Sequence, residues 1–184
     1  MDPRECILFS GGTRGSEAEF GAQAERLGIE EVNFSFAGHQ VLRSRGRREL
    51  TEAELEKGDM SLSYISGLMN RTYSATPAFR KILQTIWYQI SNGQEVYVVG
   101  WIQPDNTVKG GTGWGAELAK LCYKPLFAFD QQRDAWFSWH KDRWEEAVGP
   151  RIQQTRFTGT GTRFLEENGK KAIAELFERS FKSA

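Results

Sequence analysis

The stretch "CILFSGGTRGSEAEFGAQAERLGIEEVNFSFAG" (residues 6–38) is typical of a strand, a helix and a second strand in succession. Its first seven residues form a short, mainly apolar run that ends in Gly-Gly, which predicts a buried strand that enters a turn. Residues 16–28 place Phe20, Ala24 and Leu27 at helical spacing, with Ser16 as an expected N-cap and Gly28 as a stop. Residues 30–38 then alternate apolar and polar side chains, so the whole stretch predicts a βαβ unit.

The rest of the chain continues this alternation. Helices are expected over 51–58, over 77–93, from about 114 to 123 and near the C-terminal end, and buried strands over 95–102 and 125–130. Residues 134–147 predict a small antiparallel hairpin with Lys141 and Asp142 near its turn, and 39–50 a basic surface loop. Residues 59–75 fit no single element. We expect one α/β domain over 1–184, with a mostly parallel sheet flanked by helices.

Composition excludes several classes of function. The chain has 184 residues, and its 24 Lys and Arg balance its 24 Asp and Glu. A nucleic-acid or membrane-surface binder is usually basic, so we expect neither partner. No apolar run approaches the roughly 18 residues of a membrane span, and no signal-peptide core precedes the first strand. Cys6 and Cys122, without metal-ligand spacing, are expected as buried free thiols of a cytoplasmic protein.

Two glycine-rich turns carry the main functional signal. Each of "SGGTRGSE" (10–17) and "KGGTGWGAE" (109–117) follows an expected strand and leads into a helix. Glycines let backbone N–H groups approach a guest, and a helix N-terminus adds partial positive charge, which suits a phosphate. The candidate ligand-binding residues are Ser10, Gly11, Gly12, Thr13, Arg14 and Gly15 in the first turn, and Gly110, Gly111, Thr112, Gly113 and Trp114 in the second. The alternative is that both are only tight turns; neither fits a Walker A loop or GxGxxG.

Both turns resemble known motifs. "SGGTRGSE" resembles the SGGARGID-type turn of DNA-processing protein A, and "GGTGWGAE" is similar to the PGGxGTxxE signature of the cytokinin-activating phosphoribohydrolases, the lysine-decarboxylase-like proteins. Lys109 replaces the Pro of that signature and Trp114 its Thr. Both families belong to the SLOG superfamily. The resemblance, over roughly residues 6–130, implies a Rossmann-like sheet, a nucleotide or nucleotide-derived ligand and a homo-oligomer, often a dimer.

A few other residues are candidates. The resemblance implies that Glu117 helps to cleave an N-glycosidic bond; the alternative is a first-turn acid that stabilises the helix dipole. Asn70 and Arg71 in "MNRTYSATP" (69–77) would reach a phosphate or base, or belong to a solvated loop. Thr160 in "FTGTGTR" (157–163) would close over the ligand, or lie in a loose connection. His39 and His140 lack Cys or acidic partners nearby, so no metal site is predicted.

The predicted function is binding of a phosphorylated nucleotide, or a ligand derived from one, between 10–17 and 109–117. In this hypothesis Arg14 and the glycine amides hold the phosphate, Trp114 covers the ring or sugar, and Glu117 touches the ribose. The protein would be a sensor or carrier. The alternatives are a nucleoside monophosphate N-glycosidase and a structural dimer with vestigial turns. No cofactor is indicated beyond the nucleotide or phosphate itself.

Overall fold

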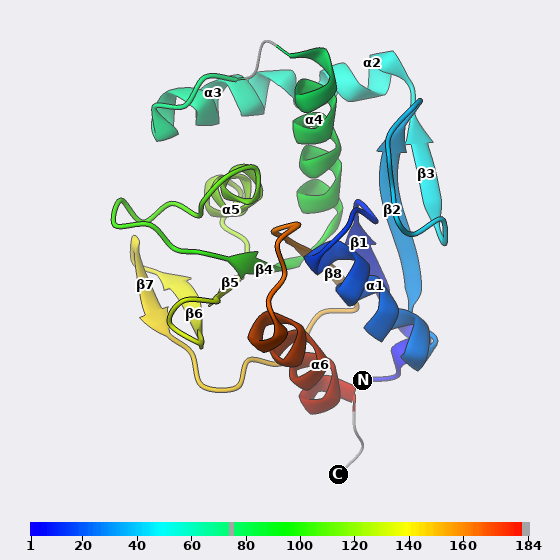
Figure 1. Cartoon of the computed structure of the whole chain (residues 1–184), viewed down its shortest axis with the longest axis vertical. Helices are drawn as coiled ribbons and strands as arrows, with labels where there is room; N and C mark the ends of the chain where they lie inside the picture. The colour runs from blue at the N-terminus through cyan, green and yellow to red at the C-terminus, as the bar shows by residue number, and fades with distance from the viewer. Residues whose placement is uncertain (74–75, 182–184) are drawn as a thin grey trace.

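A mixed β-sheet forms the centre of the molecule in the computed structural model, which describes residues 1–73 and 76–181 (Figure 1). Within those residues the sheet has eight strands in the order β3-β2-β1-β8-β4-β5-β6-β7. The six from β3 to β5 are parallel, and β6 is antiparallel to both of its neighbours, β5 and β7. The strands are β1 Ile7–Ser10, β2 Glu30–Phe36, β3 Arg47–Leu50, β4 Glu95–Gly100, β5 Leu126–Asp130, β6 Ala135–His140, β7 Arg143–Glu146 and β8 Arg156–Gly161. The α/β class with a mostly parallel sheet is therefore confirmed.

Helices cover both faces of the sheet (Figure 1). They are α1 Ser16–Leu27, α2 Glu52–Leu55, α3 Asp59–Met69, α4 Pro77–Asn92, α5 Thr112–Leu121 and α6 Glu167–Phe181, with short 3₁₀ turns at Pro3–Glu5 and Glu56–Gly58. α1 and α6 pack on one face, and α3, α4 and α5 on the other. Successive strand residues point to opposite faces, so Tyr97 joins the first core and Val98 the second. Burial on both faces explains why β4 is apolar throughout its middle.

The strand β8 corrects the expectation for residues 157–163. This Gly/Thr run is neither a closing loop nor a loose connection: residues 157–161 belong to a strand, which pairs with β1 on one side and β4 on the other. Its small residues let helices come close, since a Cβ on Gly159 would lie 2.5 Å from Cγ of Phe20 in α1. Consequently β1 and β4, which precede the two glycine turns, are not neighbours in the sheet.

Three local expectations also change. Residues 39–50 are not all surface loop, because Arg47–Leu50 forms the edge strand β3, parallel to β2. The unassigned stretch 59–75 contains helix α3, and its last two residues lie outside the described part of the chain. Gly15, not Ser16, is the N-cap of α1, and the Ser16 hydroxyl donates instead to the carbonyl oxygen of Thr162 at 2.9 Å.

Other expectations hold. Gly28 ends α1 in the left-handed conformation, and Thr51 with Glu54 forms a capping box at α2. The hairpin β6–β7 turns at Lys141 and Asp142, both with positive φ, and continues the sheet beyond β5. None of the helices in the described residues combines the length and apolar character that crossing a membrane requires.

Candidate ligand-binding site

The first half of the glycine turn 10–17 binds an internal carboxylate. Glu17, in the first turn of α1, is 5% exposed. Its carboxylate accepts a 3.0 Å hydrogen bond from the amide of Thr13 and a second bond from the Thr13 hydroxyl. A Cβ on Gly11 would lie 2.8 Å from Oε2 of Glu17, so the turn closes tightly around this side chain. Gly11 and Thr13 therefore face the protein's own anion.

Other polar groups in and beside this half of the turn also form hydrogen bonds within the protein. The Ser10 hydroxyl donates to the carbonyl oxygen of Gly159 at 2.7 Å, and the Thr160 hydroxyl donates to Glu17 at 3.0 Å. The carbonyl oxygen of Gly12 accepts from the amides of Leu42 and Arg43 at 2.9 and 3.0 Å. Ser10, Gly12 and Thr160 thus fix the turn against β8 and the 39–46 loop.

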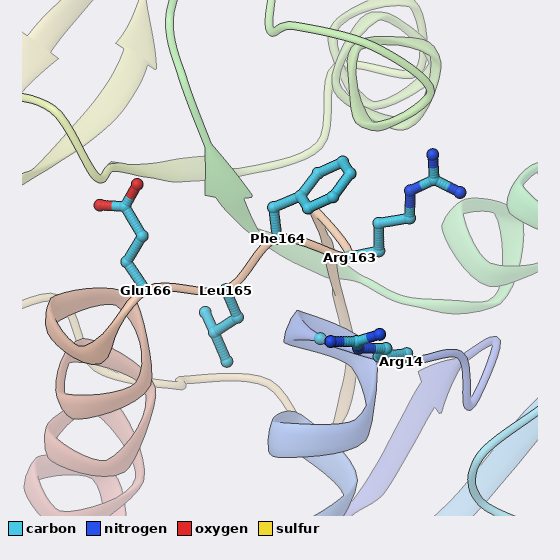
Figure 2. Close-up of a pocket in the computed structure, with 6 residues that line it drawn as sticks. Arg14, Arg163, Phe164, Leu165 and Glu166 are labelled. Atoms are coloured by element: carbon cyan, nitrogen blue, oxygen red, sulfur yellow. The ribbon is translucent and has the colours of Figure 1, made fainter.

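The second half of the turn opens to a pocket. Arg14, Gly15, Arg163, Phe164, Leu165 and Glu166 line a hollow of about 380 Å³ between the N-terminus of α1 and the segment that joins β8 to α6 (Figure 2). Gly15 has φ +93°, and a Cβ there would lie 2.5 Å from the carbonyl oxygen of Thr162. A residue without a side chain is therefore needed for the two segments to meet, which brings Arg14 and Arg163 to one pocket.

Both arginines of this pocket are exposed and unpaired. Among the described residues, neither Arg14 nor Arg163 makes an ion pair, and Arg14 makes no hydrogen bond. The Arg163 guanidinium lies over the ring of Phe164, 4.9 Å from its centroid. By contrast, all four arginines of the run 43–48 pair with acids; the pairs are Arg43 with Glu25 and Glu31, Arg45 with the same two acids, Arg47 with Glu49, and Arg48 with Glu54. The free cationic groups at Arg14 and Arg163 are available to an anionic ligand.

The second glycine turn borders a separate pocket. A hollow of about 490 Å³ is lined by Arg71, Thr72, Phe79, Gln103, Lys109, Gly110, Gly111 and Trp114. The two pockets share no lining residue, because β8 and the segment after it lie between the turns. The expected single cradle between 10–17 and 109–117 is therefore not formed as one pocket.

Close packing accounts for the other residues of the second turn. A Cβ on Gly113 would lie 2.1 Å from the carbonyl oxygen of Val108, so glycine is required at that close approach. Thr112 is buried as the first residue of α5, and Gly110 has φ +72°. Trp114 is 3% exposed and belongs to the core on the α4 side, with its ring tilted against Tyr73. Most of its indole is therefore covered by protein.

Arg71 holds the loop that carries this turn. Its guanidinium donates to the carbonyl oxygens of Val108 and Gly110 at 3.2 and 3.3 Å, and to the side chains of Gln103 and Thr107 at 2.6 and 2.7 Å. These four bonds engage both terminal nitrogens of the guanidinium within the protein. Asn70 is the left-handed C-cap of α3.

Glu117 lies in neither pocket lining. Its carboxylate is 2.7 Å from Nζ of Lys120, and the two side chains are 14% and 12% exposed. The same ammonium lies 3.7 Å from the ring centroid of Trp139 and 5.2 Å from that of Trp144, in the hairpin. Burial lowers the pKa of Lys120 below its ordinary value. This group of four residues joins α5 to the hairpin.

No group of three or more His, Cys, Asp or Glu side chains within residues 1–73 and 76–181 is placed to hold a metal ion. Cys6 is buried, and burial raises the pKa of its thiol. Cys122 is exposed, which corrects the expectation of two buried thiols, because α5 ends there at the surface.

Sequence reasoning did not single out Phe164 and Glu166, which line the first pocket, and it included Arg163 only as the end of a Gly/Thr run. The available signal was the position of "TRFLEE" between a strand and a helix. This position points to a ligand only if 157–161 is a central parallel strand, because ligands bind at the carboxyl ends of such strands.

Comparisons of the chain with protein-family models, with curated proteins and with solved structures gave no match.

Proposed function

We propose that the protein binds a phosphorylated nucleotide or a ligand derived from one, as a sensor or carrier, with the phosphate between Arg14 and Arg163. The observation that carries the proposal is that these two arginines are unpaired and line one pocket at the N-terminus of α1. Most arginines in the described residues pair with acids, as the run 43–48 illustrates. Two arginines without acidic partners in one pocket indicate an anionic ligand.

The physical chemistry of the pocket favours a phosphate. Guanidinium groups form charge-assisted, often bidentate hydrogen bonds to phosphate oxygens. The helix dipole of α1 adds partial positive charge, and the amide of Gly15 lies at the same end. A volume of about 380 Å³ falls within the roughly 300–1,000 Å³ of typical small-molecule sites. This placement is consistent with the resemblance of "SGGTRGSE" to a SLOG-type turn.

Binding is favoured over hydrolysis by the position of Glu117. An N-glycosidase of the resembled kind needs a carboxylate beside the ribose. The Glu117 carboxylate instead pairs with Lys120 and lies outside the pocket between Arg14 and Arg163. A structural dimer with vestigial turns gives no reason for two arginines without acidic partners to line one pocket.

The test is calorimetric titration with nucleoside monophosphates, nucleoside diphosphates and inorganic phosphate. We expect saturable binding by the wild type, weakened about tenfold or more in Arg14→Ala and in Arg163→Ala, since a hydrogen bond to a charged group contributes about 1.5–3 kcal/mol. Arg26→Ala removes the same charge at the far end of α1 and should leave affinity unchanged. Absence of binding, or binding indifferent to both substitutions, contradicts the proposal. Release of free base by the wild type would favour the N-glycosidase.

A further inference from the structure

We propose that residues 164–166 recognise the part of the nucleotide beyond the phosphate: the base stacks on Phe164, and Glu166 accepts hydrogen bonds from a pair of adjacent donors on the ligand. This inference rests on the proposed function and deepens it, because it names the chemistry that would select one nucleotide from another. Four observations carry it, concerning the backbone, Leu165, the ring and the carboxylate.

The backbone of this segment is held firmly by one buried side chain. Gln131, which follows β5, is 3% exposed. Its Nε2 donates to the carbonyl oxygen of Phe164 at 3.2 Å, and its Oε1 accepts from the amide of Glu166 at 2.7 Å. A Cβ on Gly169 would lie 2.5 Å from that Oε1, so the amide group is closely enclosed. The amide of Phe164 also donates to the hydroxyl of Thr162 at 3.1 Å.

Leu165 anchors the middle of the segment. Its side chain packs against the core between the sheet and α1 and α6. In Figure 2 it points away from the side on which Phe164 and Glu166 project. A backbone fixed on both sides of an inward leucine presents residues 164 and 166 on the same outward side. Such preorganisation reduces the entropy that a ligand must offset on binding.

The aromatic ring is available for stacking. Phe164 is 64% exposed although its backbone is bound at both its amide and its carbonyl oxygen. The guanidinium of Arg163 lies over the ring, 4.9 Å from the centroid, which leaves the opposite face to a ligand. Exposed aromatic rings beside cationic groups are the usual platform for nucleobases in proteins that bind nucleotides in single strands.

The carboxylate of Glu166 is free as well. Among the described residues it forms no ion pair and accepts no hydrogen bond, although two arginines line the same pocket. Figure 2 shows Arg163 and Glu166 directed to opposite sides of Phe164. The pocket therefore keeps a cationic end and an anionic end apart, with an aromatic ring between them.

The order of arginine, aromatic ring and carboxylate in the pocket matches the order of phosphate, base and donor groups in a nucleotide. A carboxylate has two acceptor oxygens, so its natural partner is a pair of adjacent donors. In nucleotides such pairs occur on the N1–H and N2 amino edge of guanine and on the 2′,3′-hydroxyls of ribose. The shared chemistry is a pair of adjacent donors on the nucleoside part of the ligand, and the experiment distinguishes its two sources.

The experiment is calorimetric titration of wild type, Phe164→Ala and Glu166→Gln with GMP, IMP, AMP and 2′-deoxy-GMP. Loss of base stacking predicts about tenfold weaker binding of every nucleotide to Phe164→Ala. Glu166→Gln should weaken binding of the preferred nucleotide about tenfold and remove the preference for it. Tyr64→Ala, another exposed aromatic, and Glu167→Gln, the neighbouring acid outside the pocket lining, are the matched controls and should bind as the wild type does.

The nucleotide series identifies the donors. Preference for GMP over IMP and AMP, lost in Glu166→Gln, places the carboxylate at the guanine edge. Equal affinity for all three bases, with weakened binding of 2′-deoxy-GMP only while Glu166 is present, places it at the ribose. Affinities unaffected by both substitutions overturn the inference while leaving the proposed function intact, provided that binding still depends on Arg14. If the wild type binds no nucleotide, the proposed function itself fails.

Discussion

The hydroxyl of Thr160 in β8 donates a 3.0 Å hydrogen bond to the carboxylate of Glu17 in α1, and both side chains are buried. The bond joins the helix to the central strand directly beneath the first glycine turn. Because the same carboxylate accepts two hydrogen bonds from Thr13, one side chain sets the shape of the turn from inside the protein.

Replacement of Glu17 by Ala should therefore lower the free energy of unfolding by about 2–3 kcal/mol. The substitution leaves the Thr13 amide and the Thr160 hydroxyl without their acceptor, and each buried unsatisfied group costs about 1–3 kcal/mol. Urea denaturation followed by circular dichroism measures the change. Glu19→Ala, on the same helix, removes only a bond to the half-buried Gln23 and should change stability by less than about 0.5 kcal/mol. Equal effects of the two substitutions would contradict this account.

A methyl group at Gly159 should be costly because of its contact with Phe20. The added Cβ would lie 2.5 Å from Cγ of that buried ring, and overpacking of this kind costs about 1–3 kcal/mol. Combining Gly159→Ala with Phe20→Leu should cost less than the sum of the two single substitutions. Gly67→Ala in α3 is the control: it has open space around it and should stabilise the protein by up to about 1 kcal/mol. Additive effects of Gly159→Ala and Phe20→Leu in thermal unfolding would refute the contact as the cause.

Because of Glu95, the free energy of unfolding should fall as the pH rises above the pKa of glutamate in the unfolded chain. The side chain is 2% exposed, and burial raises its pKa above the ordinary 4.5 although its Oε1 accepts from the amides of Gln153 and Gln154. A raised pKa in the folded state contributes stability that is fully present below the unfolded pKa and is lost as the pH rises through the folded value.

The measurement for Glu95 compares wild type and Glu95→Gln by urea denaturation at several pH values from 4 upward, in steps of about one pH unit. Gln keeps an acceptor oxygen for both amides without a buried charge. We expect Glu95→Gln to gain stability relative to the wild type as the pH rises. A difference between the two proteins that is constant with pH would show that the Glu95 carboxyl does not titrate differently in the folded state.

Lys120 and Glu117 should couple strongly in stability. Lys120→Met removes the ammonium that lies 2.7 Å from the Glu117 carboxylate and 3.7 Å from the Trp139 ring, and we expect a loss of about 2 kcal/mol. Adding Glu117→Gln should recover part of that loss, with a coupling energy of about 0.5–3 kcal/mol in a double-mutant cycle. The exposed pair Lys171 and Glu175, treated in the same way, should couple by no more than about 0.5 kcal/mol.

The same pair separates a structural role of Glu117 from a role in binding. Glu117→Gln alone should leave nucleotide affinity as in the wild type, because its carboxylate faces Lys120 and the hairpin. A loss of affinity in Glu117→Gln, without loss of folded protein, would restore the role implied by the family resemblance.

Much of the fold could be predicted because its signals are local. The βαβ unit of residues 6–38, the apolar strands near 96 and 126 and the hairpin turn at Lys141 and Asp142 all follow from periodicity and turn chemistry. The strand β8 could not, because Thr and Gly give no apolar run. Its glycines let Phe20 and Ser16 of α1 approach the strand closely, and these contacts form only in the folded protein.

The candidate site was predictable to a smaller extent, for a related reason. The motif placed Arg14 and Gly15 at the mouth of a pocket, but it gave no sign that Gly11 and Thr13 face the internal carboxylate of Glu17. A buried acid in the first turn of a helix looks the same in sequence as one that faces solvent. The contribution of Phe164 depends on β8, so it became visible only with the sheet order.

The position of β8 has a consequence for the order in which the sheet can form during synthesis. β8 (residues 156–161) is the last strand in the sequence, yet it lies between β1 and β4 in the sheet. The hydrogen bond from Ser10 to Gly159 spans 149 residues. Until β8 leaves the ribosome, neither β1 nor β4 can form its pairing with that strand, and unpaired strand edges favour aggregation. The topology thus leaves the central pairing of the sheet to the last strand of the chain.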